Sequence, residues 1–112
     1  MPEELFHAEV ELSNVRESPL PGPYRGHAGL RRWRDDLFEV VEEGRFDVNE
    51  VVDAAHANAV VIRVRLRGRA KHTGIDVDFP FSIVSWFREA RIYRSVGYTD
   101  QAEALEAAGL SE

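Results

Sequence analysis

The sequence predicts an α+β domain in which helices cover the apolar face of a strongly curved, mainly antiparallel sheet. The first observation is an alternation of apolar and mostly arginine side chains over 59–69, the period-two pattern of a strand with one face toward a core. The second is a similar alternation over 75–87, after a short turn at 71–74. The third is a change to helical spacing over 28–43. Because a sheet this long cannot leave its apolar face in water, the strands and this helix are expected to pack together.

The N-terminal part of the chain predicts two short elements and a loop. Residues 2–7 can form one helical turn, and Val10 and Leu12 alternate with glutamates in a first strand over 8–14. Three prolines fall within 18–26, and together they exclude both a helix and a central strand. This Pro/Gly-rich stretch is therefore expected to be a loop.

The helix predicted over 28–43 has an apolar stripe. Leu30, Trp33 and Leu37 recur at helical spacing with charged residues opposite them, and Gly44 is expected to end the helix. The predicted core joins this stripe to the apolar strand positions that face it: Leu30, Trp33, Leu37, Val60, Ile62, Val64, Phe79, Phe81 and Ile83.

Two further strands and a second helix complete the predicted domain. One strand is expected over 46–54, before the arginine-bearing strand, and another over 92–98, after a tight turn. Thr99 or Asp100 is expected to cap an alanine-rich helix over 101–108, which a glycine ends.

Length and composition limit the class of protein. A chain of 112 residues is expected to form a single domain over 1–112 with its own core. The lack of cysteine excludes thiolate chemistry and fits a reducing compartment, and the net charge of −6 argues against nucleic-acid binding. The acidic N-terminus does not resemble a signal peptide, and no apolar run approaches the ~20 residues of a membrane span. We therefore expect a cytoplasmic protein that binds neither nucleic acid nor membrane.

Three stretches of the chain carry a family resemblance. Residues 24–33 resemble a glycine turn entering a helix, 87–92 a turn between two strands, and 98–110 a C-terminal ending, all as found in the SnoaL-like family of the NTF2-like superfamily. The resemblance implies a cone-shaped sheet around a pocket. Members of this superfamily include polyketide cyclases, ketosteroid isomerases, epoxide hydrolases and binding domains, so the resemblance implies a role of one of these kinds. The family's usual first helix is expected to be missing, or to lie upstream in a longer natural chain.

The last predicted strand departs from the enzymes of that superfamily. They often place an aspartate on pocket strands, where a dry cavity raises its pKa and lets it move protons. Ser95 and Gly97 stand at the positions where an acid would resemble the cyclases. The remaining catalytic candidates are His27, Tyr24 and Tyr93, although a loop histidine bonded to the backbone is the simpler interpretation of His27. No histidine pair has metal-motif spacing, so neither a metal nor a cofactor is expected.

Aromatic and small polar side chains are predicted to line the pocket. Such a wall favours transfer of an apolar ligand but has little means to stabilise developing charge. We therefore expect a domain that binds a small hydrophobic molecule or acts as a dimeric module. The alternative is a small isomerase, polyketide cyclase or hydrolase of the SnoaL type. The predicted ligand-binding residues are Trp33, Phe79, Phe81, Ile83, Ser85, Tyr93 and Ser95.

The opposite face of the sheet predicts a homodimer. Val84 and Trp86 fall on the same face as Arg63 and Arg65, and exposed apolar residues there would need a partner subunit to cover them. Aspartates across the hairpin are expected to pair with the arginines.

Overall fold

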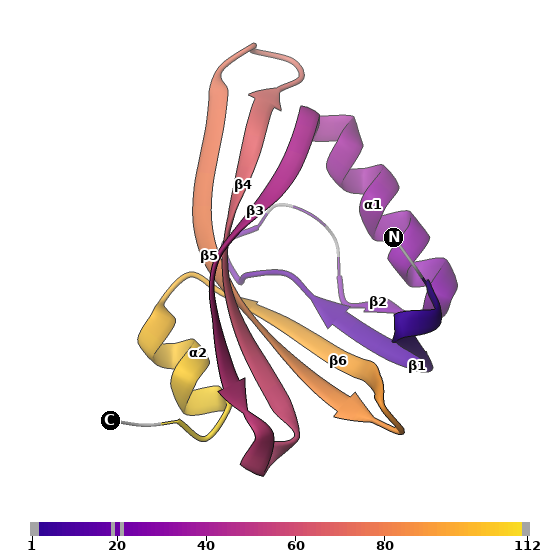
Figure 1. Cartoon of the computed structure of the whole chain (residues 1–112). Helices are drawn as coiled ribbons and strands as arrows, with labels where there is room; N and C mark the ends of the chain where they lie inside the picture. The colour runs from indigo at the N-terminus through magenta and orange to yellow at the C-terminus, as the bar shows by residue number, and fades with distance from the viewer. Residues whose placement is uncertain (1–2, 19, 21, 111–112) are drawn as a thin grey trace.

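The structure, a computed structural model, describes residues 3–18, 20 and 22–110. It confirms the predicted α+β class: six strands of the described chain form one curved sheet, with α1 against one face and α2 against the other (Figure 1). In the described residues, no helix is long and apolar enough to span a membrane. In chain order the elements are η1 (Glu3–Leu5), β1 (Phe6–Ser13), β2 (Tyr24–Arg25), α1 (Gly26–Val40), β3 (Val41–Ala54), η2 (Ala55–Ala57), β4 (Ala59–Ala70), β5 (Asp76–Arg88), β6 (Arg91–Tyr98) and α2 (Gln101–Ala107).

The sheet has the strand order β2-β1-β6-β5-β4-β3. All neighbouring strands are antiparallel except β1 and β6, which are parallel. The central hairpin of β4 and β5 places Val64 opposite Phe81 and Leu66 opposite Phe79, so the predicted apolar positions of both strands share one face. This face is concave and looks toward α1 (Figure 1).

The N-terminal predictions are close to the structure but not exact. The first strand starts at Phe6, two residues earlier than expected, and a single turn of 3-10 helix precedes it within the described chain. The end of the predicted loop forms the short strand β2, whose Tyr24 pairs with Leu12 of β1. Pro19 and Pro21 of the loop lie outside the described residues.

The predicted end of the first helix is wrong. Val41, which follows α1, is already extended, with φ −126° and ψ 121°, and it pairs with Ala70 of β4. Gly44 lies inside β3, where a β-bulge interrupts the pairing and Glu43 takes a φ of 53°. The helix therefore ends early because the long antiparallel pairing with β4 satisfies the backbone of this segment.

The predicted core on the concave face is only partly confirmed. Leu30 and Leu37 of α1 and Val64 of β4 are buried. Phe79 is 38 % exposed, so its assignment to the core is wrong. The reason is that α1 does not lie flat on the sheet: a cavity separates part of the helix from the strands. Half-buried members of the predicted core are Trp33, Val60, Ile62, Phe81 and Ile83.

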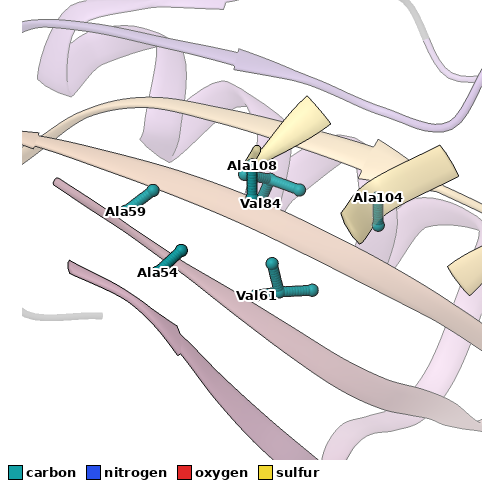
Figure 2. Packing of buried hydrophobic residues seen from close by; sticks show 6 residues of the cluster. All are labelled: Ala54, Ala59, Val61, Val84, Ala104 and Ala108. Carbon is teal, nitrogen blue, oxygen red and sulfur yellow. The ribbon is translucent and has the colours of Figure 1, made fainter. Parts of the chain in front are cut away.

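A second core lies on the other face of the sheet, beneath α2 (Figure 2). Val84 is fully buried there, and Trp86 is half-buried and packs against the cluster, so the prediction that both are exposed is wrong. Asp100 caps the helix by accepting a hydrogen bond from the Ala102 amide at 2.8 Å. The alanines of α2 allow it to approach the strands closely. The buried cluster consists of Ala54, Ala59, Val61, Val84, Ala104 and Ala108.

The arginine row on this face is paired within the chain. Arg65 donates to both carboxylate oxygens of Asp78 across the hairpin, at 2.8 and 3.2 Å, which confirms the expected cross-strand pairing for this aspartate. Arg63 instead donates to the Ser82 hydroxyl at 3.1 Å and to the Thr99 carbonyl at 3.3 Å, next to the start of α2. A homodimer through this face stays a prediction, but Val84 has no surface left to contribute to it.

Candidate functional site

The candidate site is a cavity of about 360 Å³ between α1 and the concave face of the sheet. Its wall is formed by α1, by β3, β4 and β5, and by the loop after β1. Apart from Asn14, Glu17 and Ser18, all residues of the described wall are apolar. Such a wall favours a ligand that is itself mostly apolar.

Four aromatic rings form a continuous strip from the helix to the sheet in this wall. Trp33 of α1 stacks on Phe46 of β3, with ring centroids 5.9 Å apart and planes at 20°. Phe46 meets the edge of Phe81 at 6.2 Å, and Phe81 stacks on Phe79 at 5.5 Å. The sequence patterns predict that Trp33 packs directly on the β5 aromatics and do not single out Phe46. The position of Phe46 at the start of the predicted 46–54 strand was the available sequence signal for its place in the wall.

The structure brings together only part of the predicted ligand-binding set. Trp33, Phe79 and Phe81 line the cavity. Ser85 and Ser95 lie opposite each other on β5 and β6, where their buried hydroxyls share a hydrogen bond of 2.9 Å. Strand periodicity placed them on the same face as the β5 aromatics, but α1 and the cavity occupy a different part of that face. The predicted residues outside the described cavity wall are Ile83, Ser85, Tyr93 and Ser95.

Tyr24, one of the catalytic candidates, is committed to a structural contact. Its side chain is buried, and its O–H donates to Asp36 Oδ2 of α1 at 2.8 Å. Burial and then the bond to the Asp36 carboxylate raise the pKa of Tyr24 to about 12. A phenol held protonated in this way is not a base at neutral pH, and Tyr24 does not belong to the described cavity wall.

The other two catalytic candidates also lie outside the described wall. His27 Nε2 lies 3.0 Å from the Phe6 carbonyl, within hydrogen-bond distance, and His27 Nδ1 lies 3.8 Å from Glu3 Oε1. The backbone bond matches the simpler interpretation of His27, but the residue lies in the first turn of α1 and not in a loop. The Tyr93 ring carries the Arg88 guanidinium 4.3 Å from its centroid. Each of the three candidates is thus engaged by its own partner outside the described cavity wall.

Gly97 shows why the last strand carries no acid beside the loop that borders the cavity. A Cβ at position 97 would lie 3.0 Å from both the backbone nitrogen and Cγ1 of Val15, which lines the cavity. A larger side chain such as aspartate has no room there unless the loop moves. The titratable group of the described wall is instead Glu17, an exposed residue whose carboxylate accepts a hydrogen bond from the Thr99 hydroxyl at 3.4 Å.

Asn14 is a polar residue of the wall that the sequence patterns do not single out. Its Oδ1 accepts a hydrogen bond from Trp33 Nε1 at 3.0 Å, which ties the end of β1 to the middle of α1. Its Nδ2 is buried and has no hydrogen-bond partner among the described residues. A polar residue at the end of a strand, just before a loop, was the available sequence signal.

The sequence model of the SnoaL-like domain matches residues 3–95 of the chain. No curated protein matches it significantly. The family match spans β1 to most of β6 and includes every residue of the described cavity wall.

Solved structures share the fold at low sequence identity. A protein from Catenulispora acidiphila with a ketosteroid isomerase-like fold, in complex with trimethylamine, is 17 % identical, with a TM-score of 0.75 over 96 % of this chain and 79 % of its own. An NTF2-like protein of unknown function from Burkholderia pseudomallei is 18 % identical, with a TM-score of 0.74 over 92 % and 79 %. A SnoaL-like protein from Jannaschia sp. CCS1, provisionally assigned as a polyketide cyclase, is 16 % identical, with a TM-score of 0.72 over 97 % and 76 %. The family match and these shared folds show that the chain belongs to the SnoaL-like family and has the NTF2-like fold.

Proposed function

We propose that the protein binds a small, largely apolar molecule in the cavity between α1 and the sheet. The observation that carries the proposal is the cavity itself, whose volume of about 360 Å³ falls within the ~300–1,000 Å³ typical of small-molecule sites. Its apolar wall supplies the transfer free energy, and its few polar groups supply orientation.

The mouth of the cavity supports the same proposal. Phe46 and Phe79 both line the cavity, and each is 38 % exposed to water. A ligand that covers ~100 Å² of such apolar surface gains ~2.5 kcal/mol from that area. The ligand also buries apolar surface of its own. We expect a binding free energy of ~8 kcal/mol or less, which corresponds to a dissociation constant in the micromolar range or weaker.

Binding without chemical conversion is better supported than catalysis. Related structures include one provisionally assigned as a polyketide cyclase, but that assignment belongs to a protein only 16 % identical to this chain. Acid–base chemistry in this cavity would have to use Glu17, the titratable residue of the described wall. Because Glu17 is exposed, it lacks the water-excluded surroundings of a catalytic carboxyl group. We therefore place an isomerase, cyclase or hydrolase activity second.

A neutral fluorescent probe, N-phenyl-1-naphthylamine, tests the proposal. We expect saturable binding to the purified protein, seen as an increase in probe emission. Leu66→Trp should fill the cavity and weaken binding at least tenfold, because Leu66 is part of the wall. Val51→Trp is the matched control: Val51 is 61 % exposed on the neighbouring strand and is not part of the described wall. Probe binding that survives Leu66→Trp, or that is absent from the wild type, would contradict the proposal.

A cytoplasmic location is also part of the proposal. It is supported by the absence of cysteine from the sequence, which fits a reducing compartment. Cell fractionation with detection of the native protein tests it, and recovery in a periplasmic or secreted fraction would contradict it.

A further inference from the structure

We infer that the ligand of this cavity is a cation, an amine or quaternary ammonium compound with an apolar body, and that the Glu17 carboxylate selects its positive charge. The inference rests on the proposed function, because it specifies the charge of a molecule bound in that cavity. It assigns to Glu17 the role of a specificity-determining residue, separate from any catalytic role.

The charges of the cavity wall have one sign. Glu17 is the charged residue of the described wall, and no lysine, arginine or histidine lies among the residues that form it in the described part of the chain. A carboxylate or sulfonate group taken into the cavity would therefore lose water without gaining a positive partner, and Glu17 would repel it. The net charge of −6 on the whole chain acts in the same direction. Anionic ligands are thus disfavoured.

The negative charge of Glu17 is not balanced within the described chain. The neighbouring Arg16 pairs with Glu103 of α2 at 3.6 Å. Among the described residues, no arginine, lysine or histidine nitrogen lies within 4.0 Å of the Glu17 carboxylate. Glu17 Oε2 accepts a hydrogen bond from the neutral Thr99 hydroxyl at 3.4 Å, which does not cancel the charge. The charge therefore remains available to a ligand.

The carboxylate can select a cation without touching it. A round cavity of about 360 Å³ is ~9 Å across, which is less than the ~10 Å over which exposed charges interact at about 0.1 M salt. Because Glu17 is exposed to water, the attraction is modest, and added salt weakens it further. Binding of a cation that weakens with salt is therefore a signature of this contribution.

The aromatic part of the wall favours the same ligand. Trp33, Phe46, Phe79 and Phe81 all line the cavity, and Phe46 and Phe79 are partly open to water. The face of an aromatic ring carries partial negative charge and attracts an ammonium group within about 6 Å of its centroid. The rings also cover the methyl or methylene groups around the nitrogen. Together with Glu17, they favour a cation with an apolar body over a small, strongly hydrated ion.

Three probes built on one naphthalene ring separate charge from apolar burial. The cation is trimethyl(2-naphthylmethyl)ammonium, and the anion is 2-naphthylmethanesulfonate. The neutral probe, 2-neopentylnaphthalene, has the shape of the cation with carbon in place of nitrogen. Each probe is titrated against N-phenyl-1-naphthylamine bound to the purified protein at neutral pH. At low salt we expect the cation to bind the wild type about tenfold more tightly than the anion, and the difference should shrink as salt is added.

Glu17→Gln is the decisive variant. It keeps the size of the side chain and an acceptor for the Thr99 hydroxyl, and it removes the charge. Binding of the cation at low salt should weaken about twofold to fivefold, the effect of one exposed charge pair, while binding of the neutral probe stays the same. Glu106→Gln is the matched control, because it removes the same charge from an exposed residue of α2 outside the described wall, and it should leave cation binding unchanged. Far-UV circular dichroism checks that both variants are folded.

The outcomes distinguish this inference from the proposed function. Equal binding of cation and anion to the wild type, or unchanged cation binding in Glu17→Gln, would overturn the inference, while binding of the neutral probe would leave the proposed function standing. If Glu17→Gln weakened the cation and the neutral probe alike, Glu17 would shape the cavity without selecting charge, and the inference would again be overturned. Failure of the wild type to bind N-phenyl-1-naphthylamine and all three probes would remove the proposed function and the inference with it.

Discussion

Val84→Ala tests whether α2 covers the outer face of the sheet. Val84 lies on β5, and its side chain is fully buried in the cluster beneath α2 (Figure 2). If the residue were instead exposed and waiting for a second subunit, the same substitution would be nearly neutral in the isolated chain.

The magnitude follows from the surroundings of Val84. The substitution removes two carbon atoms, worth ~1.6 kcal/mol at ~0.8 kcal/mol per buried methylene. Its neighbours Ala104 and Ala108 have short side chains attached to the helix backbone, so they cannot expand into the space that is left. With this cavity contribution, the free energy of unfolding should fall by about 2–3 kcal/mol. For a domain of this size that lowers Tm by roughly 8–12 °C.

Urea unfolding followed by far-UV circular dichroism measures the loss, with the slope m expected to stay unchanged. Val51→Ala is the matched control, because it makes the same chemical change at a residue that is 61 % exposed on β3. Its cost should stay within ~0.5 kcal/mol.

A loss below 0.5 kcal/mol for Val84→Ala would refute the packing of α2 on this face. A loss that shrinks as the protein is diluted would show instead that Val84 is buried by a second subunit.

Three further predictions address the other parts of the fold. Tyr24→Phe should cost about 1.5–3 kcal/mol at pH 7, because it removes a hydrogen bond to the Asp36 carboxylate. The folded Tyr24 has a pKa of about 12, whereas the unfolded phenol ionises near pH 10. Wild-type stability should therefore also fall between pH 10 and 12. Urea titrations at pH 9 and 11 should show this extra loss in the wild type and not in Tyr24→Phe. Gly97→Ala should cost about 1–3 kcal/mol and shift the amide resonance of Val15, whose nitrogen would lie 3.0 Å from the new Cβ; unchanged resonances with full stability would count against this close approach. The predicted homodimer should appear in sedimentation at high micromolar concentration as a species of twice the monomer mass. Its interface should contain Arg63, Arg65 and the exposed part of Trp86. A monomer at that concentration would remove the prediction.

Much of the fold could be predicted from the sequence because strand periodicity reports which residues share a face. The alternations over 59–69 and 75–87 match β4 and β5 to within one residue at each end. The cap at Asp100 was also predictable, since it depends on contacts only two residues apart. Both signals are local: a side chain's direction and a cap are decided by the backbone nearby.

Periodicity does not say which element covers a face along its length, because that depends on residues distant in the sequence. Gly44 was read as a helix end, but pairing between β3 and β4, distant in sequence, turned that segment into a strand. Val84 was read as surface because arginines flank its position, but α2 folds back over that part of the strand from the end of the chain.

The candidate site divides in the same way. By itself the sequence determined that Trp33, Phe79 and Phe81 face a common interior, since helix and strand spacing are properties of the local backbone. Tertiary structure alone decided that Phe46 and Asn14 join them and that Ser85, Ser95 and Tyr93 do not. The physical reason is the placement of α1, which a cavity separates from one part of the curved sheet. The position of a helix against a sheet depends on packing between residues far apart in the chain, and local spacing does not report it.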